Sequence, residues 1–265
     1  MYLTVIPADK ILSHESGRYD GREDVYMPFG LLRSVAGRLD KVDIALATMG
    51  GVVEQQVAGS IEAFERGDAI LAEEICLRDA EVDEQERLIE REVVAILEAS
   101  RPGGASLRRA MTAIKLAAEM ERIGDLSKNI AKRTKVLSAS DDIESMRRVM
   151  PTVVRMGRRA LTQFGESLDS LFRSNAAAAR AVREADDQID DLYNSIFREI
   201  LVSMSQYTAG IVTGTHLVFV AKNYERIGDH ATNIAERVHY TLTGLELTEE
   251  RTKTDNTSVT ALSVS

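Results

Sequence analysis

Hydrophobic and polar residues follow a helical period through most of the chain, in long stretches separated by turn-forming residues. We expect helices over residues 31–66, 68–100, 106–137, 142–172, 175–205 and 208–240. Gly67 ends the first helix, and Asp68 and Asn175 are preferred N-cap residues for the second and fifth. Pro151 falls inside the fourth stretch, where we expect a kink or a late helix start.

The chain contains an internal repeat. Residues 49–94 align without gaps on residues 156–201 at an offset of 107. The sequence ERIGD at residues 121–125 recurs at residues 225–229, at an offset of 104. A repeat of this length indicates a duplicated structural unit, and each copy contains three of the expected helices.

Composition supports an all-α protein. Aromatic residues make up only 5% of the chain and Trp is absent, whereas sheets rely on aromatic and β-branched residues. We place the first three-helix unit at residues 30–137 and the second at residues 138–243. An N-terminal extension over residues 1–29 and a flexible C-terminal tail over residues 244–265 fall outside the repeat.

Charge and cysteine content reduce the range of possible functions. The formal net charge is −9, and basic residues are interleaved with acidic ones at helical spacing, which is typical of solvated helix faces. No basic patch stands out, so we expect no direct nucleic-acid binding. Cys76, the only cysteine, excludes an intramolecular disulfide, and its apolar neighbours predict a small core residue. No secretory signal or membrane-spanning stretch is evident, so we expect a cytoplasmic protein.

Four pairs of acidic residues share the spacing i, i+4, which places both members on one helix face. The pairs are Asp79 and Asp83, Glu121 and Asp125, Asp186 and Asp190, and Glu225 and Asp229. The first two pairs are equidistant from Pro102, and the last two from the point between Tyr207 and Thr208. Antiparallel hairpins that turn at these points therefore set four carboxylates level with one another, and Asn129 and Asn233 continue the stripes.

Four carboxylates that face one another cannot all ionise without positive charge between them. A metal, protons, or the neighbouring Arg122 and Arg226 are the candidates. Oxygen-only ligands favour hard cations such as Mg²⁺, Mn²⁺ or Fe³⁺, and zinc stays open. We expect all eight acidic residues to be metal ligands, and Gly124 and Gly228 to allow close helix approach beside them.

The doubled ERIGD motif and the acidic pairs of the preceding helices resemble those of the PhoU family of phosphate-uptake regulators, over nearly all of residues 30–243. The resemblance implies two tandem three-helix bundles, six long helices in all, related by pseudo-two-fold symmetry, with iron or zinc clusters on the acidic pairs. It implies a negative regulator of phosphate uptake and of the phosphate-starvation response. Such a regulator links the ATPase subunit of a phosphate ABC transporter to a sensor histidine kinase. The resemblance also implies a homodimer that meets the inner membrane only through its partners.

The two motif copies differ at their outer edge. The second copy has His230 and Glu236 where the first has Leu126 and Lys132. The first site is therefore expected to be less acidic there, and metal occupancy can differ between the units.

Two other interpretations are compatible with the sequence. A carboxylate-bridged di-iron oxidase needs two inward-facing Glu-x-x-His motifs, and the chain has one, which ends at His239, so we do not expect an enzyme. A metal-independent helical adaptor, with acidic faces that arginine neutralises and that contact a basic partner, has the same predicted fold. Salt-sensitive partner binding that ignores chelators would favour the adaptor.

Overall fold

The computed structural model describes residues 29–185 and 187–247. These ranges are helical and contain no strand, which confirms the predicted all-α class. Apart from Phe29, the predicted N-terminal extension lies outside the described residues, as do Asp186 and residues 248–265 of the predicted tail. In the described part of the chain, no helix combines the length and apolar character needed to cross a membrane.

Three long helices form the first repeat. They are α1 (Phe29–Arg66), α2 (Ala69–Ser100) and α3 (Gly104–Ser138). Gly67 ends α1 with a φ of 64°, a left-handed conformation that glycine adopts at little cost. The Asp68 carboxylate then accepts hydrogen bonds from the backbone N–H groups of Ile70 and Leu71, both at 3.0 Å. The first turn between helices therefore lies where the sequence predicts it.

The second repeat follows the same plan with two interruptions. Its helices are α4 (Met150–Phe172), α5 (Ala176–Glu184), α6 (Asp187–Gln206) and α7 (Ile211–Thr243), with short 3-10 helices η2 (Ile143–Met146) and η3 (Thr208–Gly210). The structure describes the expected helix over residues 175–205 as α5 and α6, with the undescribed residue 186 between them. Asn175 caps α5 as predicted, because its side chain accepts a hydrogen bond from the N–H of Ala178 at 3.0 Å.

Pro151 produces a late helix start rather than a kink. It lies in the first turn of α4, where its missing N–H group would have no intrahelical partner in any case. The helix therefore begins at Met150 and not near Asp142, and part of the preceding stretch forms η2.

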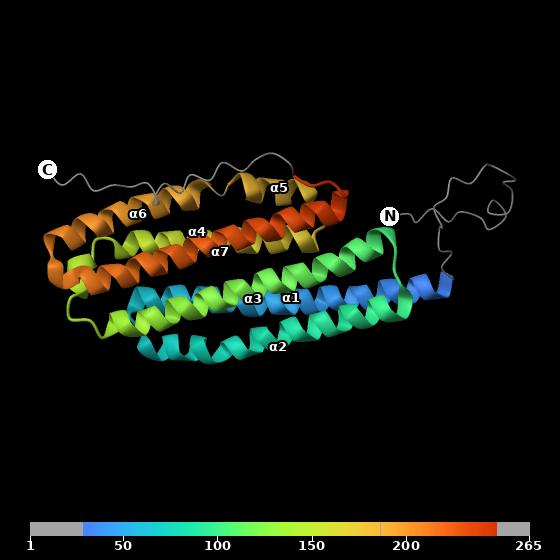
Figure 1. The fold of residues 1–265 in the computed structure, drawn as a ribbon, viewed down its shortest axis with the longest axis horizontal. Coiled ribbons are helices and arrows are strands. Elements are labelled where there is room, and N and C mark those ends of the chain that lie inside the picture. Colours follow the sequence, from blue (N-terminus) through green and yellow to red (C-terminus); the bar gives the residue numbers. More distant parts are fainter. Residues whose placement is uncertain (1–28, 186, 248–265) are drawn as a thin grey trace, which may run out of the picture.

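The helices run side by side along the long axis of the molecule (Figure 1). In the first repeat α1 and α2 pack on α3, and in the second α4, α5 and α6 pack on α7. The repeats meet through α3 against α7 and through α1 against α4. Both contacts pair equivalent helices, as a two-fold relation requires. The predicted pair of three-helix bundles with pseudo-two-fold symmetry is confirmed.

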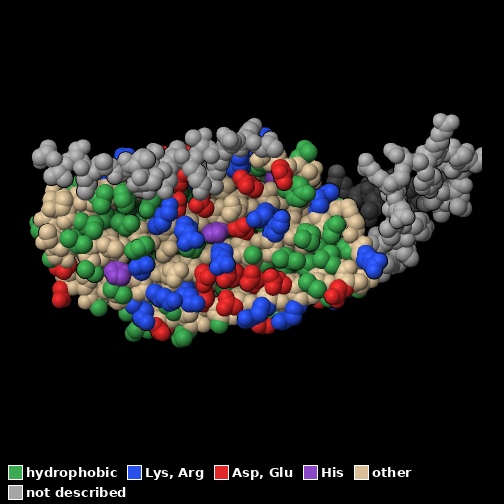
Figure 2. All heavy atoms as spheres, viewed as in Figure 1, with side chains coloured by type: hydrophobic (Ala, Val, Ile, Leu, Met, Phe, Trp, Pro, Cys, Tyr) green, Lys and Arg blue, Asp and Glu red, His purple; other side chains and the backbone are tan. Residues whose placement is uncertain are grey.

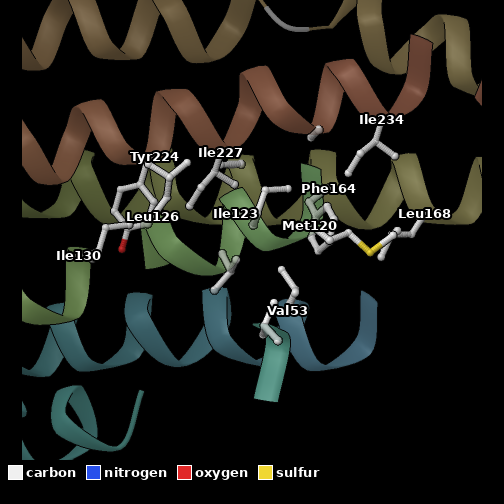
Figure 3. Packing of buried hydrophobic residues seen from close by; sticks show 14 of the residues in the cluster. Val53, Met120, Ile123, Leu126, Ile130, Phe164, Leu168, Tyr224, Ile227 and Ile234 are labelled. Atoms are coloured by element: carbon white, nitrogen blue, oxygen red, sulfur yellow. The ribbon is translucent and has the colours of Figure 1, made fainter. Parts of the chain in front are cut away.

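One hydrophobic core runs through both repeats. Figure 3 shows Met120 and Ile123 of α3 between the helices, near Phe164 of α4 and Ile227 of α7. All four side chains are fully buried. Cys76 lies apart from this core, half-buried at the edge of a small second cluster on α1, α2 and α3.

Glycine allows the closest approach in this core. A Cβ atom added at Gly157 of α4 would lie 2.8 Å from Cζ of Tyr224 and 3.1 Å from Cγ1 of Ile61. The Tyr224 ring is fully buried and has no free space to enter. At Gly51 of α1, by contrast, nothing lies within 4 Å of the added atom.

We expect Gly157→Ala to lower the free energy of unfolding by about 1–3 kcal/mol, because the methyl group overpacks a closed site. Gly51→Ala is the matched control and should raise it by roughly 0.5–1 kcal/mol, because alanine is the better helix former. Urea unfolding followed by circular dichroism measures both values. Effects of the same sign would contradict the close packing at Gly157.

Candidate functional site

The four acidic residues predicted in the first repeat lie on the adjacent helices of the α2–α3 hairpin. Asp79 and Asp83 are on α2, and Glu121 and Asp125 are on α3. Asp79 is 3% exposed, whereas the side chains of Glu121 and Asp125 are 17% and 39% exposed. The cluster therefore extends from the interior to the surface. Figure 2 shows acidic side chains gathered in the middle of the visible face, over α2 and α3.

The surroundings of Glu121 raise the pKa of its carboxyl group. Burial raises the pKa of Glu121 to about 7, and the charge of Asp125 contributes to the shift. Arg122 opposes it, while Glu86 and Asp83 raise the pKa further. Carboxylates of both helices therefore lie close enough to compete for positive charge. Glu86 was not among the predicted site residues, although its place three residues after Asp83 puts it on the same face of α2.

Positive charge reaches this cluster from α3. The Lys128 ammonium donates a hydrogen bond to Oδ2 of Asp79, and this bond raises the pKa of Lys128. Arg122 lies 3.5 Å from a carboxylate oxygen of Glu121 and 3.7 Å from one of Asp125. The flanking arginine was expected from the sequence, whereas Lys128 was not.

A buried glutamine from the first helix of each repeat reaches the hairpin. In the first repeat, Nε2 of Gln56 donates to Oδ1 of Asp79 at 3.3 Å and to the carbonyl of Gly124 at 3.4 Å. In the second, Nε2 of Gln163 donates to the carbonyl of Gly228 at 3.5 Å. Gln56 aligns on Gln163 at the offset of 107, a signal in the sequence that points to this shared role.

Gly124 has the role that the sequence predicts for it. A Cβ atom there would lie 3.3 Å from Cγ1 of Val82 and 3.4 Å from Oε1 of Gln56. The glycine thus permits α3 to approach α2 and the glutamine of α1 beside the acidic cluster.

The second hairpin carries its acidic residues on α6 and α7. Asp190 and Glu225 are each 3% exposed and Asp229 is half-buried, whereas Asp186 lies outside the described residues. The Lys222 ammonium lies 2.9 Å from Oε1 of Glu225. The predicted Arg226 is exposed, and the ion pair of Glu225 is formed by Lys222.

Glu225 is the buried carboxylate of this second cluster. Burial raises the pKa of Glu225, and the hydrogen bond from Lys222 offsets this only in part. The charges of Asp229 and Asp190 add to the rise. Oε2 of Glu225 is buried without a hydrogen-bond partner in the described part of the chain. Leaving a buried acceptor unpaired costs about 1–3 kcal/mol, so this atom favours any donor or cation that reaches it.

No three Asp, Glu, His or Cys side chains of residues 29–185 and 187–247 converge closely enough to hold one metal ion. Lys128 and Lys222 place an ammonium group beside the acids instead. These lysines are not equivalent in the repeat, because at the offset of 104 Lys128 corresponds to Thr232 and Lys222 to Ala118. Each hairpin therefore has a cation of its own.

A further buried carboxylate joins the two repeats. Oε2 of Glu119, on α3, lies 2.7 Å from Nδ1 of His230 and accepts a hydrogen bond from Nδ2 of Asn233 at 3.2 Å. Its other oxygen accepts one from Arg237 at 2.8 Å. Burial alone would raise the pKa of Glu119, but these hydrogen bonds from α7 lower it to about 2. Glu119 was not predicted as a functional residue, although it is an acid in the apolar run that precedes ERIGD.

The outer edge of the second hairpin is engaged by other parts of the chain. Asn233, one turn beyond Asp229 on α7, donates a hydrogen bond to Glu119 of the other repeat. The Glu236 carboxylate lies 2.8 Å from Nε of Arg183, whose side chain is 11% exposed. At 3.6 residues per turn, a stripe of residues four apart drifts around the helix, which brings Asn233 within reach of α3.

Comparison with known proteins places the chain among helical proteins with a duplicated domain. Residues 46–134 and 153–238 match the PhoU domain. The phosphate-specific transport system accessory protein PhoU homolog of Caulobacter vibrioides is 39% identical over 224 residues, which span 84% of this chain and 96% of that protein. The protein of the same name from Rhizobium meliloti is 39% identical over 213 residues, spanning 80% and 89%.

A solved structure agrees with these relatives. The crystal structure of PhoU from Pseudomonas aeruginosa superposes with a TM-score of 0.69 at 31% identity, covering 79% of this chain and 99% of that one. The fold and the sequence thus define a double PhoU-domain protein. The chain belongs to the PhoU family.

Glu119 should make stability depend on pH in acid. Its pKa is about 2 in the folded protein against 4.5 ordinarily, so its contribution is fully present above pH 4.5 and is lost as the pH falls toward 2. We expect Glu119→Gln to lower the free energy of unfolding at pH 7 by roughly 2–3 kcal/mol and to flatten this dependence. Denaturant titrations at neutral and acidic pH measure both effects.

Glu62→Gln is the control for that substitution. Glu62 forms an exposed ion pair with Arg66 at 2.6 Å, and its loss should cost at most about 0.5 kcal/mol. A Glu119→Gln variant that keeps the pH profile of the unchanged chain would show that Glu119 does not stabilise the contact between the repeats.

Proposed function

We propose that this chain is an accessory protein of phosphate transport that restrains phosphate uptake, and that its two acidic hairpins bind metal cations. Membership of the PhoU family and the names of its relatives support the transport role. The gathering of carboxylates from α2 and α3 around Glu121, whose pKa is raised to about 7 by burial first and by these neighbouring charges second, carries the metal part of the proposal. A cation between these groups would remove the repulsion that contributes to this shift.

Each site would use the four acids of one hairpin. The ligands would be Asp79, Asp83, Glu121 and Asp125 in the first repeat, and Asp186, Asp190, Glu225 and Asp229 in the second. All supply oxygen, which suits hard cations. Iron is the metal we propose first, with zinc, manganese and magnesium as alternatives. The buried and unpaired Oε2 of Glu225 supports the second site, because it offers a lone pair in the interior.

Metal binding in this arrangement requires the lysine to leave each cluster. The side chain of Lys128 is 29% exposed and that of Lys222 is 36% exposed. Each ammonium group can therefore reach water by a change of rotamer, and the carboxylates can turn inward at the same time. A divalent or trivalent ion places more positive charge between the acids than one ammonium group does.

The chain would regulate phosphate uptake by binding protein partners. Exposed helix faces would contact the ATPase subunit of a phosphate ABC transporter and a sensor histidine kinase, from the cytoplasmic side of the inner membrane. In this way the chain, as a homodimer, would repress the phosphate-starvation response when phosphate is plentiful. Metal would act by fixing the geometry of the hairpins that present these faces. The proposal includes no catalytic step.

A second candidate function is a metal-independent adaptor. Lys128, Lys222 and Arg122 place positive charge beside the acids without any metal, and this observation favours the adaptor. The acidic face over α2 and α3 (Figure 2) would then contact a basic partner surface directly. Raised salt would weaken such a complex, and a chelator would leave it unchanged.

Elemental analysis of protein purified without chelators or a metal-affinity column tests the metal proposal. We expect roughly one or more equivalents of iron, zinc or manganese per chain, lost in the Asp125→Ala/Asp229→Ala double variant, because each substitution removes a proposed ligand. Repression of phosphate-starvation genes by that variant should fail too. Asp141→Ala, at an exposed position between the repeats, is the control and should keep both. Folded protein that lacks metal yet represses normally would contradict the metal proposal and favour the metal-independent adaptor.

The exchange of lysine for a metal ion in the acidic clusters can be tested separately. Lys128→Met removes the ammonium group from buried Asp79, so it should lower the free energy of unfolding of metal-free protein by roughly 2–4 kcal/mol. Added Mn²⁺ should then stabilise the variant more than the unchanged chain, because the ion no longer competes with lysine. Thermal unfolding with and without Mn²⁺ measures this. Lys132→Met, at an exposed position of the same helix, should behave like the unchanged chain. An identical response to Mn²⁺ in all three proteins would contradict the exchange.

A further inference from the structure

A cavity of about 560 Å³ lies between α3 and α7, where the two repeats meet. Its walls come from the first half of α3, the last half of α7 and the segment that follows α7. Gly244 ends α7 with a φ of 74°, and Glu246 and Leu247 beyond this turn close one side of the cavity. None of the eight proposed metal ligands lines it, so the cavity is separate from the proposed metal sites.

Two cations line this cavity without an acidic partner among the described residues. Nε of Arg108 is buried and has no hydrogen-bond acceptor within the described ranges. Lys115, two turns further along α3, is exposed and takes part in no ion pair there. The neighbouring Arg109 shows the contrast, because it lies outside the cavity and is paired with Asp40 and Asp43 at 2.7 and 2.6 Å.

The other charged residues of the cavity are largely neutralised. Arg237 donates to Glu119, and Glu236 binds Arg183. Glu246 is the remaining acid of the lining, so the positive charge of Arg108 and Lys115 exceeds the unpaired negative charge. A guanidinium group with an unused, buried N–H favours an oxyanion, because the planar donors match carboxylate and phosphate geometry.

The rest of the lining suits an occupant larger than a small inorganic anion. Leu107, Met111 and Tyr240 line the same cavity and are 40%, 44% and 37% exposed, which is a large exposure for such side chains in one place. Figure 2 shows apolar side chains gathered on this face over the N-terminal part of α3. The volume lies within the range of small-molecule sites and far exceeds that of one phosphate ion. An occupant that uses both features needs a flat or apolar body attached to its oxyanion.

We propose that this cavity binds a small aromatic phosphomonoester of the size of a nucleoside monophosphate. Its phosphate contacts Arg108 and Lys115, and its base lies against Tyr240, Met111 and Leu107. Because α3 and α7 belong to different repeats, the ligand touches both at once and stabilises their contact. Glu246 and Leu247, which follow Gly244, border the site.

Calorimetric titration of the full chain with AMP, adenosine and inorganic phosphate tests this site. We expect AMP to bind at least about tenfold more tightly than either of the others, because only AMP engages both the cations and the apolar wall. Arg108→Gln should weaken AMP binding about tenfold or more, since it removes a charge-assisted contact. Arg180→Gln, at an exposed position on α5, is the matched control and should leave AMP affinity unchanged.

A second substitution separates the two halves of the site. Tyr240→Leu should weaken AMP binding and leave phosphate binding as it was, because only the apolar wall changes. Circular dichroism of each variant confirms that it is folded. Equal affinity for AMP and inorganic phosphate, no binding of AMP at millimolar concentration, or AMP binding that Arg108→Gln does not weaken would each overturn the proposal.

Discussion

The contact between α3 and α7 is the constraint on which the rest of the structure depends. Each of these helices packs against two neighbours with different faces. Buried apolar side chains such as Met120 and Ile227 face the opposite repeat, and carboxylates face the hairpin partner. Because both faces belong to one rigid helix, the contact between repeats also fixes the rotation at which the acids meet. Glu119 strengthens this coupling. A buried carboxylate is costly without its donors, so the alignment that brings it to His230 and Arg237 is favoured over displaced ones.

Most of the fold was predicted from features that depend only on residues near one another in the sequence. Gly67 and Asp68 mark a helix boundary through backbone conformation and capping, which depend on adjacent residues only. The acidic pairs were predicted from their spacing, and the described members do lie on paired helices, whereas their binding of metal stays a prediction. Lys128 and Gln56 were missed, because which side chain from a third helix or a later turn reaches Asp79 depends on lateral helix packing. Spacing along one helix contains no information about that packing.

The two repeats have similar backbone arrangements but differ in where their positive charges lie. Equivalent glutamines contact the carbonyl of the ERIGD glycine in both, and both hairpins carry acids at matching positions. The lysines come from different turns: Lys128 follows the motif of α3, and Lys222 precedes that of α7. A backbone arrangement can therefore persist while the source of positive charge moves, because any ammonium group within reach of the cluster lowers the same electrostatic cost.

The like-with-like pairing of helices has a consequence for ancestry. A single three-helix unit that carried both contact faces would associate with a copy of itself, since such an interface is self-complementary. Joining two units in one chain makes that association intramolecular, at an effective concentration on the order of millimolar. It also frees the halves to differ. At the offset of 104, Glu119 corresponds to Asn223, and His230 to Leu126. A symmetric ancestor would have had to bury this carboxylate and its partner twice or not at all, whereas the fused chain buries them once.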